Sequence, residues 1–208
     1  MALTFNGSAN TIGGLAVGGL PDGVVDTDMI AANAVTAAKR GSGAILQIVS
    51  TNKDSTFSSN ATSFTSIGLS ATITPSSSSN KILVLLNLVY GGPQNHYAYG
   101  KIIRTPSGGS ATDIALGADR TSSFSLSQRA SFSLTTPNSA SAEFKLNHAS
   151  VNFLDSPNTT AATTYAVQGY SRSGGGDGYF YINRPYTPNN QTYQVGTSSN
   201  LTLIEVAG

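Results

Sequence analysis

The 208-residue sequence contains no cysteine and no tryptophan, and only 10% of its residues are charged. The absence of cysteine excludes disulfides and thiolate metal sites. Eleven Lys and Arg against ten Asp and Glu give a net charge of +1. This balance excludes a nucleic-acid-binding protein with a broad basic surface. With so few charges, a stable fold must depend on apolar burial and backbone hydrogen bonds, and the 39% hydrophobic content is sufficient for a core.

A long hydrophobic segment is also missing. The longest apolar run, 82–86, is far shorter than the ~20 residues of a membrane-spanning helix. Residues 1–7 lack the basic start and the continuous apolar stretch of a secretory signal. We therefore expect a soluble protein, made in a cytoplasm, that does not insert into a membrane.

Residues 1–43 differ in composition from the rest of the chain, being rich in glycine and small side chains. A short helix is predicted within them over 27–40, capped by Asp26 or Thr27 and ended by Gly41 in a left-handed conformation. Such a short helix is marginal by itself in water, so it requires a neighbouring surface.

The same stretch also fits an extended fibrous stalk, because Val25, Ile30 and Val35 recur every five residues. In either form these three residues and Met29 are the candidate contacts for docking or for a trimeric stalk. The sequence leaves the choice between helix and stalk open.

From residue 44 onward the pattern is typical of β-structure. Apolar residues occupy alternate positions over 67–73 and over most of 124–134, which places one face of each strand in a core. Clusters of Ser, Gly, Asn and Pro separate these runs. Roughly nine short strands of this kind predict a mainly β domain over 44–208, an antiparallel β-sandwich or jelly roll.

Two predicted strands, 81–90 and 201–206, are apolar on both faces. A sandwich strand normally has one face in water, so something is expected to cover the second face. A loop or the N-terminal segment could do so. We favour another copy of the chain, in a closed homo-oligomer.

Groups able to perform catalysis are few. His96 and His148 are the only histidines, and neither shows the closely spaced histidine and carboxylate pattern of a zinc site. No nucleophile-elbow sequence accompanies the many serines. We therefore expect no enzyme activity, no metal and no cofactor.

Tyrosines are the remaining candidates for binding. Tyr97 and Tyr99 flank the His96 loop, and Tyr186 precedes Asn189 and Asn190 in a predicted turn. Tyrosine combined with Asn, Ser and Gly is typical of adaptable binding surfaces, and aromatic faces also stack on sugars. These five residues are the candidate receptor contacts, although such rings more often complete a core or a subunit interface.

Several segments, in order, resemble parts of tailed-bacteriophage fibre proteins of the marine-phage type. IAANAVTAAK at 30–39 is similar to the I-A-x-x-A-V-T-x-A-K repeats of those fibres. The segments similar to their globular end domain are GAILQIV (43–49), ITPSSSSNKILV (73–84), SVNFLDSP (150–157), YINR (181–184) and LTLIEVA (201–207).

The resemblance implies a virion structural protein, a homotrimeric fibre whose N-terminus faces the particle and whose end domain attaches to a glycan or protein of the host surface. It supplies no catalytic motif. With one stalk-like repeat, the chain fits a short tail fibre. A fibre on the capsid, or a capsid decoration protein, is the alternative.

Overall fold

A computed structural model describes residues 4–6, 11–13, 35, 39–118, 129–139, 144–172, 178–187 and 195–208. These residues form β-strands and connecting segments, with no α-helix among them. No helix in this described part is long and apolar enough to cross a membrane. The chain divides into two compact units, residues 1–41 and residues 42–208.

The first unit contains β1 (Thr4–Asn6), paired antiparallel with β2 (Thr11–Gly13), a pairing not predicted from the glycine-rich sequence. The predicted helix or stalk lies outside the described residues, apart from Val35, Lys39 and Arg40. Gly41 has a φ angle of 75°, the left-handed conformation predicted for it.

The second unit is an antiparallel β-sandwich, which confirms the predicted fold class. Its strands are β3 (Ile45–Lys53), β4 (Phe57–Ser59), β5 (Thr65–Ile73), β6 (Lys81–Gly91), β7 (Ala98–Pro106), β8 (Thr112–Ile114), β9 (Phe132–Ser133), β10 (Asn147–Asp155), β11 (Thr163–Ser171), β12 (Phe180–Ile182) and β13 (Ser199–Val206).

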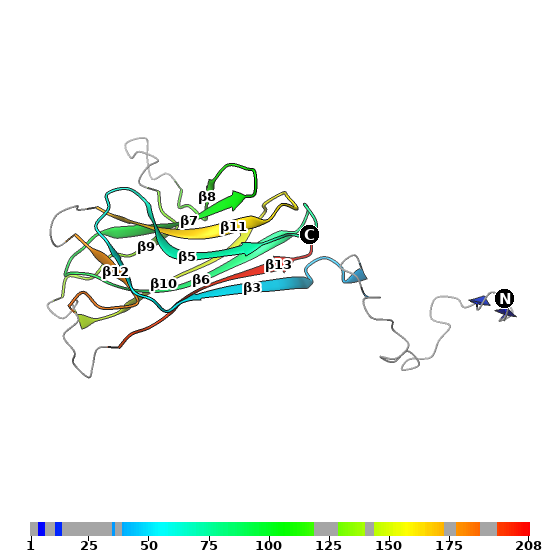
Figure 1. Cartoon of the computed structure of the whole chain (residues 1–208), viewed down its shortest axis with the longest axis horizontal. Helices are drawn as coiled ribbons and strands as arrows, with labels where there is room; N and C mark the ends of the chain where they lie inside the picture. The colour runs from blue at the N-terminus through cyan, green and yellow to red at the C-terminus, as the bar shows by residue number, and fades with distance from the viewer. Residues whose placement is uncertain are drawn as a thin grey trace. The chain divides into compact units, whose positions relative to one another are not determined.

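The strands form two stacked layers, which Figure 1 shows from the side. In the first sheet the order is β3-β13-β6-β12-β4, and β10 pairs with the other edge of β6. In the second sheet the order is β5-β11-β7-β8, and β9 also pairs with β7. We call the end where β3 begins and β13 finishes the proximal end. The opposite end, where β6 leads into β7, is the distal end.

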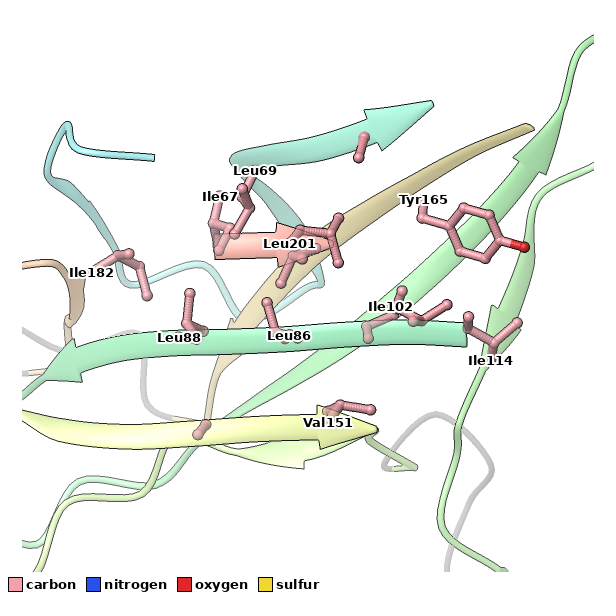
Figure 2. Packing of buried hydrophobic residues seen from close by; sticks show 14 of the residues in the cluster. Ile67, Leu69, Leu86, Leu88, Ile102, Ile114, Val151, Tyr165, Ile182 and Leu201 are labelled. Carbon is pink, nitrogen blue, oxygen red and sulfur yellow. The ribbon is translucent and has the colours of Figure 1, made fainter. Parts of the chain in front are cut away.

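The core lies between the sheets. Alternate residues of β5 are buried, from Ile67 to Ile73, as the period-two pattern predicted. They face the buried alternate residues of β6, and Figure 2 shows Leu86 and Leu88 directed toward the β5 side chains. Of the second predicted run, 124–134, only 132–133 form a strand among the described residues, and Leu134 is buried in the core.

Polar side chains close the proximal end. Arg104 Nη1 lies 2.8 Å and 3.0 Å from the two carboxylate oxygens of buried Asp155, and Tyr165 donates a 2.7 Å hydrogen bond to the same carboxylate. Asp155 belongs to β10, whereas Arg104 and Tyr165 belong to β7 and β11, so these bonds join the two sheets. Burial, the hydrogen bond and the negative charge of Asp155 raise the pKa of Tyr165 well above its usual range, so the phenol stays protonated.

Glu205, on β13, holds the turn that precedes β6. Its carboxylate accepts hydrogen bonds from Gln47 Nε2 (2.5 Å), Asn80 Nδ2 (2.6 Å), Ser76 N (2.6 Å) and Ser76 Oγ (2.8 Å). Burial of the carboxylate raises its pKa, but these hydrogen bonds outweigh burial, and the net pKa is lowered. Two segments of the fibre resemblance, 73–84 and 201–207, are therefore in direct contact.

Asn183 performs a similar role nearer the distal end. Its backbone has a φ angle of 63°, and its side-chain Nδ2 donates to the carbonyls of Lys53 and Ser55. Its Oδ1 accepts a 2.6 Å hydrogen bond from Ser199 Oγ. Asparagine tolerates the left-handed region better than most residues, which suits this buried corner.

Candidate functional site

The outer face of the first sheet carries a row of apolar side chains near the proximal end. Ile48 pairs with Ile204, Ile204 with Leu83, and Leu83 with Leu154, so the four residues lie directly beside one another across β3, β13, β6 and β10. We call them the apolar row. Ile48 is 58% exposed and Leu154 47%, while Leu83 and Ile204 are half-buried.

The same face becomes polar toward the distal end. Four residues further along each strand, the corresponding positions are polar: Asn52, Asn200, Asn87 and Ser150. Asn200 Nδ2 donates to Asn52 Oδ1 at 2.6 Å. The outward apolar side chains of β6 and β13 are therefore partly exposed in a single chain. The second apolar face of these two strands thus has no complete cover within one chain, which is the reason a covering partner was predicted.

The outer face of the second sheet carries a row of aromatic rings near the distal end. Tyr99 on β7 pairs directly with Tyr170 on β11, with ring centroids 6.1 Å apart and planes inclined by 24°. Phe64, just before β5, lies 5.4 Å from Tyr170 at 36°. We call Phe64, Tyr170 and Tyr99 the aromatic row, and all three rings are partly exposed.

Polar groups adjoin the aromatic row. Lys101, two residues after Tyr99, places its Nζ 4.5 Å from the Phe64 ring centroid and 2.9 Å from Asp113 Oδ2. Gln168, two residues before Tyr170 on β11, pairs with Lys101 on β7 and with Ser66 on β5. This part of the face therefore offers an ammonium donor, a carboxylate acceptor and an amide beside two tyrosine rings.

Tyr97 extends the aromatic surface beyond the start of β7. It is 42% exposed, and the Arg172 guanidinium lies 5.6 Å from its ring centroid. Arg172 N also donates to the Tyr97 carbonyl at 3.0 Å. Tyr97 lies in a connecting segment as expected, whereas Tyr99 is a strand residue of β7 and not part of a loop.

Tyr186 belongs to a different aromatic group. It meets Tyr181 edge-on, at 5.6 Å and 62°, and the Arg184 guanidinium lies 4.4 Å from the Tyr181 ring centroid. Tyr181 is on β12, in the first sheet, so this group is separate from the aromatic row. Asn189 and Asn190 lie outside the described residues.

Of the proposed docking residues, only Val35 is described, and its side chain is 50% exposed. Val25, Met29 and Ile30 lie outside the described residues, so their predicted role stays a prediction.

His96 and Ser171 form a contact that resembles part of a hydrolase site. His96 Nε2 lies 3.0 Å from Ser171 Oγ, but Ser171 Oγ itself donates to the Gly178 carbonyl at 2.6 Å. A hydroxyl has one proton, so Nε2 must carry the hydrogen of this contact and cannot act as a base toward the serine. Both residues are buried, and burial lowers the pKa of His96 despite the opposing effect of its hydrogen bond with Gly178.

Catalytic or metal-binding constellations are not found in the described part of the chain. It holds no group of three or more His, Asp or Glu side chains placed to bind a metal. Its buried carboxylates, Asp155 and Glu205, are occupied by structural hydrogen bonds.

Phe64, Tyr170, Lys101 and Gln168 were not predicted as site residues. Their signal was alternation: Ala98, Gly100 and Ile102 face inward, which turns Tyr99 and Lys101 to the outer face. Recognising β7 as a strand would have placed Tyr99 and Lys101 on the same outer face. Their meeting with Tyr170 depends on the β7–β11 register, which a single sequence does not show.

Comparisons with known proteins give remote structural likenesses. No family model matches the chain, and no curated protein matches it. The crystal structure of the infectious bursal disease virus VP2 subviral particle aligns with a TM-score of 0.44 and 10% identity, covering 78% of this chain and 33% of that one. The structure of the Gx strain of the same virus gives 0.40 and 15%, covering 80% of this chain and 43% of that one. This chain thus spans less than half the length of either.

Proposed function

We propose that this chain is a virion structural protein, a short homotrimeric fibre that docks on the particle through residues 1–43 and attaches to the host surface through its β-sandwich. The ordered resemblance to phage fibre segments and the antiparallel sandwich fold support the proposal. Fold alone does not imply function, so the proposal depends on what the surface presents.

The observation that carries the proposal is the apolar row. Four directly paired side chains, Ile48, Ile204, Leu83 and Leu154, form an uncharged stripe on a rigid sheet. Contiguous exposed apolar surface commonly marks an interaction site. Burying what remains exposed of each side chain is worth about 1 kcal/mol, a contribution that repeats in every subunit of a closed assembly.

The partner we assign to this row is a second copy of the chain. Closed homo-oligomers are the commonest soluble assemblies, and trimeric display multiplies weak host contacts through multivalency. We further propose that the protein is not an enzyme. The inaccessible His96–Ser171 contact supports this, since neither side chain can reach a substrate.

The oligomer is tested by placing a charge in the row. Ile48→Asp and Leu154→Asp should convert the trimer to a folded monomer, measured by light scattering after size exclusion and by thermal melting. Ser70→Asp adds the same charge to the outer face of the other sheet and should leave the trimer intact. A wild-type monomer at micromolar concentration, or row variants that remain trimeric, would contradict the assignment.

Docking is tested by deleting residues 1–40. The truncated protein should fold with a normal melting transition but be lost from particles. Failure to fold would place the segment in the core of the domain, and normal incorporation would place docking in the sandwich. Imaging of labelled particles separates a tail fibre from a fibre or decoration protein on the capsid.

A further inference from the structure

We propose that the outer face of the second sheet binds a neutral glycan built of pyranose rings, with Tyr99 and Tyr170 as the stacking surface. Lys101, Asp113 and Gln168 supply the hydrogen bonds to hydroxyl groups. The inference deepens the proposed function and rests on it, because it names the ligand class through which the fibre attaches.

The stacking argument begins with the rings. One face of a pyranose presents C–H groups, which pack well against the electron-rich face of an aromatic ring. Tyr99 and Tyr170 come from adjacent strands and have planes only 24° apart, so they present a nearly parallel pair. Phe64 supports Tyr170 from the β5 side, at 5.4 Å. Rings held on paired strands lose little freedom when a ligand binds.

The polar groups match the chemistry of sugar hydroxyls. A hydroxyl both donates and accepts, so it is best served by a donor and an acceptor placed together. Lys101 Nζ and Asp113 Oδ2 are 2.9 Å apart, and Gln168 adds an amide beside Lys101 in the register. Because the ammonium charge is balanced by the adjacent carboxylate, the pair favours a neutral sugar over an anionic one.

The other aromatic group is less suited to this task. Tyr181 is buried, and Arg184 occupies its ring face at 4.4 Å. Tyr186 meets Tyr181 edge-on at 62°, so these two rings are far from parallel. Tyr186 therefore serves as the matched aromatic control.

The test uses the full chain on an array of purified bacterial surface polysaccharides and neutral pyranose oligosaccharides. For each glycan retained, we expect Tyr99→Ala and Tyr170→Ala each to weaken binding by at least about tenfold, as for central aromatic contacts. Tyr99→Phe keeps the ring and should stay within about threefold of wild type. Tyr186→Ala should bind normally, and binding should persist at about 1 M salt, where the Debye length is only about 3 Å.

Each outcome has a defined meaning. Binding to no pyranose glycan on the array, unchanged binding by Tyr99→Ala, or binding abolished by salt overturns the inference. If Tyr99→Ala instead dissociates the trimer, the face is a subunit interface and the inference is wrong. Labelled protein that binds host cells independently of both tyrosines would overturn the glycan site but not host attachment. Tyrosine-dependent glycan binding by a protein that is missing from particles would overturn only the proposed function.

Discussion

Removing the Glu205 carboxylate should loosen the proximal end of the sandwich. The side chain is only 1% exposed and accepts four hydrogen bonds, three of them on Oε1 from Ser76 and Asn80. In Glu205→Ala these donors lose their charged acceptor. Gln47 retains a second partner in the Thr74 carbonyl, 2.7 Å away. Since water can reach exposed Ser76, the expected loss in free energy of unfolding is about 2–4 kcal/mol.

Glu205→Gln separates charge from shape. Its amide oxygen can keep the bonds on the Oε1 side. Its amide nitrogen can pair with Gln47 only if the Gln47 amide turns over, which gives up the Gln47 hydrogen bond to the Thr74 carbonyl. The charge assistance and one Gln47 hydrogen bond are lost while the Oε1-side bonds are kept, so we expect a smaller destabilisation of about 1–2 kcal/mol.

Acid should remove the difference between wild type and Glu205→Gln. Because the folded-state pKa of Glu205 is lowered, its contribution is complete above the unfolded value of about 4.3 and is lost as pH falls through the folded pKa. Below that pH the wild-type side chain is neutral, like the glutamine. The gap between the two proteins should therefore close on acidification and never widen.

The assay is urea unfolding of the full chain over a series of pH values from neutral downward. Protein concentration is held constant, because the proposed association would contribute to apparent stability. Variants within about 0.5 kcal/mol of wild type at neutral pH, or a gap that grows in acid, would refute the reasoning.

Three other changes test the packing and the prediction that the protein has no metal site. Gly169→Ala should lower the free energy of unfolding in urea by about 1–3 kcal/mol, because its new Cβ would lie 2.4 Å from the fully buried Phe180 ring. The control is Gly196→Ala, whose new Cβ meets open space and should leave stability unchanged. Tyr165→Phe should cost about 1–2 kcal/mol by removing the hydrogen bond to Asp155, with wild-type circular dichroism as the check that the fold persists. Chelating agents should leave the melting temperature unchanged, and a large drop would reveal a metal site.

The fold was predictable to the extent that it depends on local alternation. Burial of every second residue in 67–73 specified β5, and the two-sided apolar pattern of 81–90 anticipated the outward Leu83. Even so, β5 departs from simple pairing. Gly68 has a φ angle of 76° within a bulge, so two extra residues oppose Val167 of β11. Alternation does not reveal such bulges.

The hydrogen bonds of Glu205 and Asn183 could not be predicted, because they join residues far apart in the sequence. Glu205 reaches Ser76 across 129 positions, and Asn183 reaches Lys53 across 130. Nothing local distinguishes these side chains from solvated ones. The candidate site divides in the same way: Tyr97 and Tyr99 were identified by residue type, whereas their grouping with Tyr170 follows from strand register.

The antiparallel pairing of β3 with β13 also determines how the sandwich responds to mechanical load. A pull transmitted from Gly43 toward a distal anchoring point runs along β3, parallel to its strand axis. The backbone hydrogen bonds between the two strands, from Ile45 opposite Val206 to Lys53 opposite Ser199, then carry the load together in shear. Separating β3 and β13 sideways at the proximal end would instead break the same hydrogen bonds one after another. The β3–β13 pairing should therefore resist tension along the strands better than sideways separation.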